Sequence, residues 1–313
     1  MIEVSINNAM ADKRLDIILV NLFPNVSRSK LKKWILNKNV LVDGNNQRPS
    51  YVAKYGENLT ISLPEPEKND SWVSQNININ IVYQDESILV IDKSPGIIMH
   101  PGSGNPDGTL LNALIYKYPE LIYLPRAGIV HRLDKDTSGL VVIARSQKSY
   151  NKLVEQMSNR AVKRYYYAIT WGQCKKNLVI NKSLSRNPKN RQKFSVSSSI
   201  KAKKAITRVF PRGLGKIGIY DLSIVECRLE TGRTHQIRVH LENFNFPIVG
   251  DKTYKKGCPN DKNLLKKIID RQALHAYFLS FEHPEKKKPI YFNSQIPNDI
   301  KNLINEAKIN VDL

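Results

Sequence analysis

The stretch from Gly128 to Arg145 joins a compact charged turn to an apolar run, and few arrangements of the chain can accommodate both. Leu140 to Ile143 are four consecutive apolar residues, as is typical of a short buried strand. Gly139 gives the backbone the freedom to enter that strand sharply. An ordinary solvated turn has a similar composition, but a turn fixed against a buried strand can hold a reactive carboxylate rigidly. The charged and polar residues of this turn are His131, Arg132, Asp134, Lys135 and Asp136.

The chain carries a large excess of positive charge. Its 313 residues include 49 Lys and Arg against 28 Asp and Glu, which gives a net charge of +21 and a pI near 9.8. Such an excess favours a polyanionic partner, most commonly a nucleic acid. A proteome biased toward lysine would produce the same charge, so the charge supports a nucleic-acid partner only together with specific motifs.

Cysteine spacing and hydropathy restrict the class of protein further. Cys174, Cys227 and Cys258 form no CxxC pair, which argues against a disulfide scaffold and against a zinc site. No apolar run approaches the roughly 18 residues of a membrane-spanning helix, and the first residues lack a secretory pattern. We therefore expect a cytoplasmic protein with reduced thiols and no membrane association.

Residues 1–75 have the pattern of a small module that begins with two helices. Apolar residues at helical spacing predict one helix over 11–23, capped by Asp12 and ended by Pro24. The same spacing predicts a second helix over 27–37. The basic residues of this second helix share one side and are Arg28, Lys30, Lys32 and Lys33.

Two short strands are predicted to follow these helices, over 40–42 and 59–63, with Asp43-Gly44 as a turn between them. Residues 1–75 hold ten basic and eight acidic residues, so the positive charge of the module is concentrated on its second helix. This concentration fits a focused contact with phosphate, whereas a solvated helix face is the alternative. The module resembles the S4 RNA-binding domain through Arg14-Leu15-Asp16, Ser27-Arg28 and Val40 to Gly44.

A proline-rich and then polar segment, residues 64–75, is typical of a linker. We place the domain boundary near residue 75, which assigns 1–75 to the module with its linker and 76–313 to a larger domain. The larger domain opens with isoleucines that alternate with asparagines over 77–81, the pattern of a half-buried strand. A second strand is predicted over 89–92.

Further segments place chemistry-bearing side chains beside predicted elements. Residues 164–168, with the sequence RYYYA, predict a strand in which Tyr166 faces away from its two tyrosine neighbours. Residues 230–240, ETGRTHQIRVH, follow a predicted strand, and a helix is expected to begin within them. Residues 182–208 carry nine basic residues and no acidic one, so they are a candidate surface for phosphates. A disordered basic loop is the alternative.

The run HRLD at 131–134, followed by TSGL at 137–140, resembles the signature of the RluA-type pseudouridine synthases. The segments 164–168 and 230–240 match further motifs of that family. The segments KSPG at 93–96 and ALHA at 273–276 also match motifs of the family. In KSPG the proline comes one position later than in the family motif. Within the family the pattern resembles most closely the RluD type, which acts on three uridines in the helix 69 hairpin of large-subunit (23S) ribosomal RNA. The RluC type, which modifies other uridines of the same RNA, is the alternative.

The resemblance implies an α+β catalytic domain over 76–313, with the pseudouridine synthase fold: a bent, mostly antiparallel mixed sheet with flanking helices. A small S4-like α/β RNA-binding domain precedes it. The resemblance also implies that Asp134 is the catalytic carboxylate, that Tyr166 is the active-site tyrosine and that Arg238 pairs with Asp134. The residues expected to contact the uridine or its RNA are Arg132, His131, Arg233, Leu274, Arg28, Lys32 and Lys33.

The reaction that this resemblance implies needs little besides an ionised carboxylate. The N1 glycosidic bond of uridine is cut, the base turns, and the sugar is rejoined through C5, so nothing is oxidised. We expect no cofactor and no metal, and the sequence has neither a Walker-type loop nor a cluster of metal ligands. Asp134 could attack the sugar, attack the uracil, or remove a sugar proton, and the sequence leaves these open. Arg238 would keep it charged in an apolar pocket, and Arg132 would replace the extruded base or bind a phosphate.

Two other classes of function are compatible with parts of the sequence. A metal-dependent hydrolase could use His100, His131, His235 and Asp134, but the spacing matches no metal-binding motif such as HExxH. A noncatalytic RNA-binding or ribosome-assembly protein would also carry an S4-like module and a basic loop. The combination of Asp134, Tyr166 and Arg238 argues for the enzyme. We expect a monomer whose partner is 23S ribosomal RNA or a precursor of the large subunit.

Overall fold

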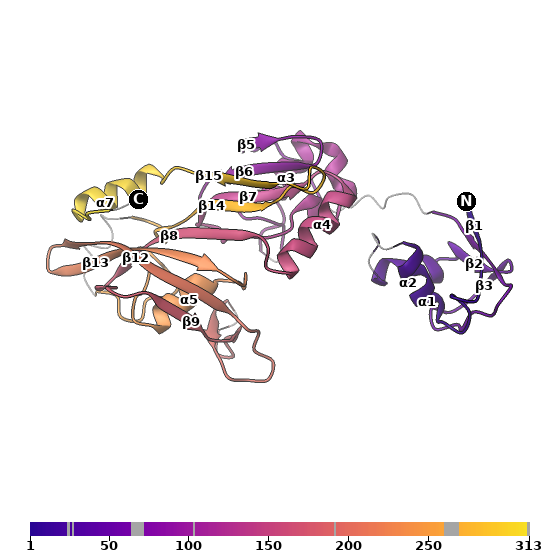
Figure 1. Ribbon diagram of the computed structural model, residues 1–313. Helices are drawn as coiled ribbons and strands as arrows, with labels where there is room; N and C mark the ends of the chain where they lie inside the picture. The colour runs from indigo at the N-terminus through magenta and orange to yellow at the C-terminus, as the bar shows by residue number, and fades with distance from the viewer. Residues whose placement is uncertain are drawn as a thin grey trace. The chain divides into compact units, whose positions relative to one another are not determined.

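The chain forms two compact units, Met1–Asp70 and Ser71–Leu313, each with its own hydrophobic core (Figure 1). The predicted helix end at Pro24, the predicted helix start at Ser27 and most of the predicted linker lie outside the described residues. No helix in the described part of the chain has the length and apolar character needed to cross a bilayer. The computed structural model describes residues 1–23, 26, 28–63, 72–102, 104–190, 192–259 and 269–311.

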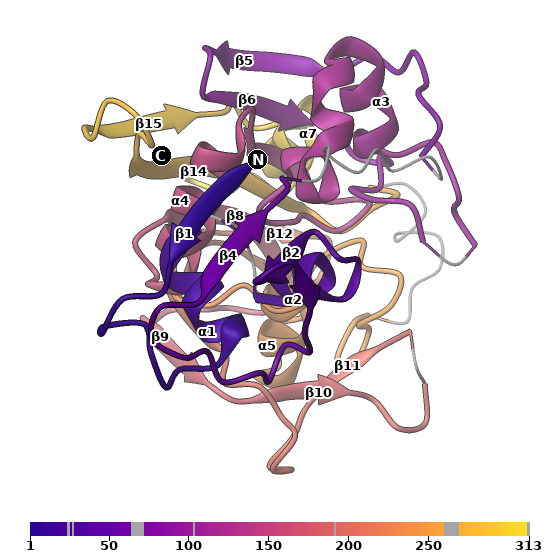
Figure 2. The same cartoon turned by 90° about the vertical axis from the view of Figure 1, so that its right-hand side faces the viewer.

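The first unit packs two helices against a small antiparallel sheet. Leu15 and Ile18 of the first helix and Leu31 and Ile35 of the second are buried in its core, as the helical spacing predicted. Strands β1 and β4 lie side by side in Figure 2. The helices are α1 (Leu15–Leu22) and α2 (Arg28–Leu36), and the sheet order is β1 (Ile2–Ser5), β4 (Asn58–Ile61), β2 (Val40–Val42), β3 (Asn45–Asn46).

Two details of the first unit differ from the sequence prediction. Helix α1 begins at Leu15 and not near residue 11, and the residue at its N-cap is Arg14, whose side chain makes no capping bond. Asp12 therefore does not cap the helix, and its backbone has a positive φ of 60°. The turn at Asp43-Gly44 is present, but it leads from β2 into the short strand β3 before the chain reaches β4.

The second unit is built on a nine-stranded mixed sheet, which confirms the α+β fold. All its strand pairs are antiparallel except β7 with β14. In Figure 1, β8 runs between one group of strands that includes β6, β7 and β14 and another that includes β12 and β13. The sheet order is β5 (Asn80–Gln84), β6 (Ile88–Lys93), β7 (Ser138–Ala144), β14 (Leu274–Glu282), β8 (Lys163–Trp171), β13 (Tyr220–Leu229), β12 (Ile206–Ile217), β9 (Leu178–Asn181), with β15 (Pro289–Asn293) paired to β14.

Helices cover parts of this sheet and are stabilised by caps that the sequence supplies. Thr109 and Asn112 form a capping box at the start of α3, and the Ser146 side chain accepts a hydrogen bond from the Ser149 backbone at the start of α4. Leu153 of α4 is buried in a cluster with residues of β6 and β7. The helices of this unit are α3 (Leu110–Lys117), α4 (Gln147–Ser158), α5 (Gln236–Asn243) and α7 (Asn298–Glu306), with 3₁₀ turns at Pro119–Tyr123 and Pro125–Gly128.

Gly139 lets strands β7 and β14 meet. Its φ is +115°, and a Cβ at this position would lie 2.2 Å from the Ala276 carbonyl oxygen. Only glycine tolerates both that backbone conformation and that approach. The strand predicted at 140–143 is fully buried from Ser138 to Ala144, so the charged turn that precedes it is attached to the centre of the sheet.

The strands that the sequence predicted in the second unit are present with two differences, whereas β9, β12, β14 and β15 have no counterpart in the prediction. Strand β5 begins at Asn80, three residues after the predicted start. The basic segment 182–208 is not a disordered loop in its described part, because it contains the paired strands β10 (Leu184–Arg186) and β11 (Phe194–Val196). The two faces of β8 agree with the prediction: Tyr166 is buried, whereas Tyr165 and Tyr167 stack on Phe278 and Tyr277 across the other face.

Candidate active site

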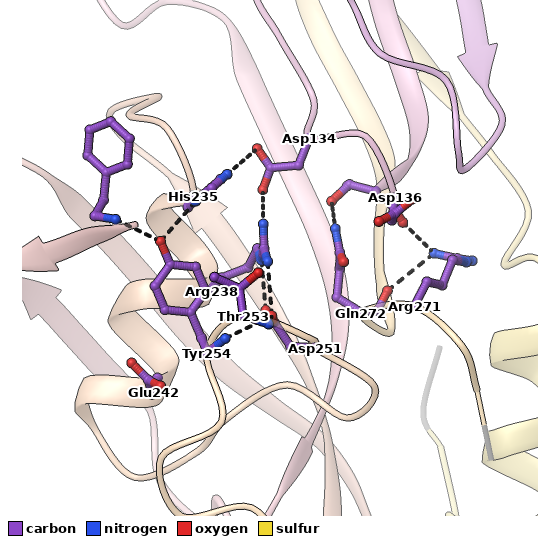
Figure 3. A network of polar contacts seen from close by, with 12 residues as sticks. Asp134, Asp136, His235, Arg238, Glu242, Asp251, Thr253, Tyr254, Arg271 and Gln272 are labelled. Atoms are coloured by element: carbon purple, nitrogen blue, oxygen red, sulfur yellow. Dashed lines mark hydrogen bonds and ion pairs between the residues drawn. The ribbon is translucent and has the colours of Figure 1, made fainter. Parts of the chain in front are cut away.

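The loop that carries Asp134 is fixed from several sides. The buried Lys93 ammonium donates hydrogen bonds to the carbonyl oxygens of Ser94, Ile97 and Lys135 at 2.8 to 2.9 Å. The Thr137 N–H donates to the Asp134 carbonyl at 3.1 Å and closes the turn. Arg271 donates a hydrogen bond to the Asp136 carbonyl (Figure 3), and the Gln272 side chain donates one to the Thr137 hydroxyl. The Asp134 side chain is therefore presented from a rigid loop.

Arg238 faces Asp134 from the first turn of α5 (Figure 3). Its Nη1 lies 3.0 Å from Asp134 Oδ2, so the pair that the resemblance implied is present. The other edge of the guanidinium is held by Asp251, through Nε to Oδ2 at 2.7 Å and Nη2 to Oδ1 at 2.9 Å. Asp251 in turn accepts hydrogen bonds from the backbone N–H groups of Thr253 and Tyr254. A bidentate carboxylate thus aims the guanidinium at Asp134.

Burial, hydrogen bonds and neighbouring charges together set the protonation states of Arg238 and Tyr166. Burial by itself lowers the pKa of Arg238, but the hydrogen bonds and charge of Asp251 and the charge of Asp134 outweigh it and raise that pKa. The guanidinium therefore keeps its charge next to Asp134, whose side chain is 15% exposed. Burial also raises the pKa of Tyr166 to about 12, so its hydroxyl is neutral at pH 7.

These side chains line one small pocket. Asp134, Tyr166, Arg238 and Leu274 all face it, although they come from the loop before β7, from β8, from α5 and from β14. Its free volume is about 40 Å³, close to the ~30 Å³ that one water molecule occupies in the liquid. Arg132 and Arg233, two of the predicted RNA-binding residues, also line this pocket.

Histidines at the site are not arranged to bind a metal. No group of three or more His, Cys, Asp or Glu side chains within the described residues could hold a metal ion. His235 Nε2 lies 3.9 Å from Asp134 Oδ1, and its Nδ1 is 2.8 Å from the Tyr254 hydroxyl. Burial lowers the pKa of His235, with the Asp134 charge opposing that shift. His131 accepts a hydrogen bond at Nε2 from the Val142 N–H, so its ring attaches the motif to β7.

The predicted RNA-binding residues of the first unit cluster around one buried carboxylate. Asp16, fully buried, accepts hydrogen bonds from Arg28 at 2.8 Å and from Arg14 at 3.1 Å, and Lys32 Nζ lies 3.8 Å from it. The side chains of Arg28 and Lys32 are still 55% and 43% exposed. Burial raises the pKa of Asp16, but the hydrogen bonds and charges of Arg28 and Arg14 outweigh it and leave that pKa lowered. Lys33 is exposed on the same helix.

Sequence reasoning missed two residues that organise the site. Asp251 holds Arg238, and its only sequence signal is its place directly after the apolar run Ile248-Val249 and a glycine. That position could have suggested a polar residue at the end of a buried segment. Lys93 belongs to a motif that the sequence singled out, but its three carbonyl partners come from the folded loops and leave no pattern in the sequence.

Two family models match the chain. A model described as RNA pseudouridylate synthase matches residues 87–243, half of the chain, and an S4 domain model matches residues 13–59. The first range contains the Asp134 loop, Tyr166 and Arg238, and the second contains α1, α2 and β2. Leu274 and Asp251 lie beyond the end of the first match.

Curated relatives and solved structures are similar over most of the chain. Proteins named ribosomal large subunit pseudouridine synthase D share 39% identity in Xanthomonas campestris, covering 96% of this chain and 91% of the relative, and 40% in Neisseria meningitidis serogroup B, covering 97% and 81%. The structure of human RNA pseudouridylate synthase domain containing 1 aligns with a TM-score of 0.60 and 24% identity over 77% of this chain and 92% of that chain. That likeness concerns the fold.

Proposed function

The chain belongs to the RNA pseudouridylate synthase family, and on that premise we propose that it converts specific uridines of 23S ribosomal RNA to pseudouridine in the helix 69 hairpin. Asp134 is the proposed catalytic carboxylate. The relatives that cover nearly the whole chain are named for the ribosomal large subunit, which supports large-subunit RNA as the target, and the helix 69 position rests on the resemblance of the sequence to the RluD type. The proposed partner is this RNA or a precursor of the large subunit, in the cytoplasm.

One observation carries the assignment of Asp134. Its carboxylate is ion-paired with Arg238 at 3.0 Å inside a pocket that Tyr166 and Leu274 also line. A carboxylate in an apolar pocket is costly to keep charged, and a guanidinium fixed beside it lowers that cost. The bonds from Asp251 fix the guanidinium before any substrate arrives. The site therefore supplies a charged oxygen without reorganisation at the moment of reaction.

The reaction balances within the nucleotide. The bond from C1′ to N1 breaks, a bond from C1′ to C5 forms, and the proton lost from C5 is matched by one gained at N1. Asp134 acts at the sugar or the base while the uracil is detached, and the Tyr166 ring packs against the uracil face. Leu274 forms an apolar wall, which keeps water from the detached base.

The target uridine must leave its helix to reach Asp134. Extruding a base costs a few kcal/mol, which contacts with the vacated stack and the phosphates can offset. Arg132 is exposed at the pocket mouth and is the side chain best placed for one of these contacts. The small volume of the empty pocket fits an opening that accompanies entry of the base.

Mapping pseudouridines in ribosomal RNA from cells with and without the gene tests this function. We expect the helix 69 positions to lose pseudouridine in the deletion strain and to regain it with the wild-type gene but not with an Asp134→Asn gene. Loss of pseudouridine elsewhere in 23S RNA would support the RluC-type alternative. An unchanged map in the deletion strain would favour a noncatalytic RNA-binding protein.

A further inference from the structure

A large cavity opens directly beside the small catalytic pocket in the second unit. Its volume is about 780 Å³, against about 40 Å³ for the pocket that holds Asp134. The two spaces share Arg132, Arg164, Gly232 and Arg233 as lining residues. Cavities of ~300 to 1,000 Å³ are the usual size for small-molecule sites. A ligand of that size in the cavity would sit next to the target uridine.

The cavity has a strongly positive lining. Arg126 and Arg160 join the three shared arginines, and Glu230 is the only acidic residue among the described lining residues. Glu230 is paired with Arg208 at 2.7 Å, so it does not neutralise the cavity. Arg126 and Arg160 have positive φ values of 53° and 58°. The charges favour a phosphate-bearing ligand.

Apolar side chains form the rest of the wall. Trp72, Leu111 and Ile129 line the cavity, and Val154 and Met157 of α4 contribute a further apolar surface. Val154 is 39% exposed although it is a large apolar residue. Flat apolar and aromatic surfaces bind the faces of nucleobases and are tolerant of base identity. The lining therefore fits a ligand with one anionic part and one flat apolar part.

Three unpartnered polar atoms lie enclosed in the wall of the same cavity. His100 Nε2, His131 Nδ1 and Arg164 Nε are buried and have no hydrogen-bond partner among the described residues. Arg164 is only 9% exposed. Burial lowers the pKa of His100 to about 4 and of His131 to about 3, so both rings are neutral at pH 7. Buried polar atoms are nearly always satisfied, so these three await a partner.

We infer that this cavity is a binding site for a second nucleotide of the RNA, one that flanks the target uridine and leaves its stack together with it. The phosphate lies against the arginines and the base against the apolar wall. This inference rests on the proposed function, because it requires an RNA substrate. It gives the enzyme a means to select its uridine by a neighbouring base.

The test combines a substrate scan with a variant that fills the cavity. The substrate is an RNA hairpin containing a uridine that mapping shows the enzyme to modify, with an abasic site placed at each other unpaired position in turn. For the wild-type enzyme we expect one position at which loss of the base weakens binding about tenfold. Val154→Trp should bind the intact hairpin about tenfold more weakly, and the abasic site at that position should cost this variant nothing further.

Two more variants keep the result interpretable. Glu155→Trp adds the same ring to the same helix outside the cavity and should bind like the wild type. Arg160→Asn removes a guanidinium, and asparagine tolerates the positive φ of this position. This variant should also weaken binding, and it serves as the test if Val154→Trp fails to fold. Equal abasic costs in wild type and Val154→Trp, or no cost at any flanking position, would overturn the inference. Conversion of the intact hairpin by the wild-type enzyme tests the proposed function separately.

Discussion

At the scale of single residues, the site depends on two carboxylates that share one arginine. Asp134 is partly exposed in a pocket, whereas the Asp251 side chain is fully buried and accepts hydrogen bonds from Nε and Nη2 of Arg238. The two residues thus have different tasks although their chemistry is the same. Asp134 faces the substrate space, and Asp251 positions the guanidinium that pairs with Asp134.

Asp251→Asn tests this positioning role. The amide NH₂ would face N–H donors of Arg238 or of the backbone, so the guanidinium should turn away from Asp134. We expect kcat for pseudouridine formation to fall about 100-fold, with little change in RNA affinity. Asp270→Asn, at a carboxylate whose side chain is 96% exposed, is the matched control. Equal kcat values for the two variants would contradict the role given to Asp251.

At the scale of elements, the site depends on how closely β7 approaches β14. Helix α5 brings Arg238, β8 brings Tyr166 and β14 brings Leu274, while the Asp134 loop is attached to the first residues of β7. The parallel contact pairs Ser138 and Gly139 with His275 and Ala276. These four residues fix the spacing between the carboxylate and the apolar wall.

Gly139→Ala should therefore disrupt both stability and activity. The new Cβ would meet the backbone of Ala276 at 2.2 Å and would force a φ of +115° on alanine. We expect the free energy of unfolding to fall by about 3 kcal/mol, measured by urea denaturation. Gly102→Ala is the control, because a Cβ there has nothing within 4 Å and its φ is not positive. Similar unfolding midpoints for both variants would show that the close approach is unimportant.

The elements differ in how well the sequence predicts them. Periodicity gave α2, α5, β6, β7 and β13 because each buries one apolar face or a short apolar run. Periodicity misjudged the start of α1. Tertiary contacts fix this start, and the Asp12 side chain does not. The parallel pair of β7 with β14 joins residues 137 positions apart, and no local pattern encodes such a pairing. Asp251 was missed because its pairing with Arg238 is defined by the fold and not by a local sequence pattern.

At the scale of the whole molecule, the chain combines an S4 domain with a synthase domain, and most of its +21 net charge lies beyond residue 75. Four of the ten basic residues of the first unit lie on α2, and two of these, Arg28 and Lys32, pair with Asp16. RNA binding should therefore draw on both units and should fall steeply with salt concentration.

Lys33→Ala tests the contribution of α2. If Lys33 contacts a phosphate, the variant should bind the substrate RNA more weakly and the slope of log affinity against log salt should decrease by about one. We expect kcat at saturating RNA to stay unchanged, because Lys33 belongs to the S4 domain and not to the pocket. Lys54→Ala, an exposed lysine of the same unit outside α2, should leave the slope unchanged. Equal slopes for Lys33→Ala and the wild type would remove Lys33 from the RNA contact.

The most direct test of the central claim is a single-turnover measurement of pseudouridine formation by Asp134→Asn on the RNA hairpin that the wild-type enzyme modifies. The substitution keeps the size of the side chain and removes its charge. We predict that the variant folds, binds the hairpin with an affinity near that of the wild type, and forms no detectable pseudouridine. Pseudouridine formation by a folded Asp134→Asn protein at a rate near that of the wild type would contradict the account.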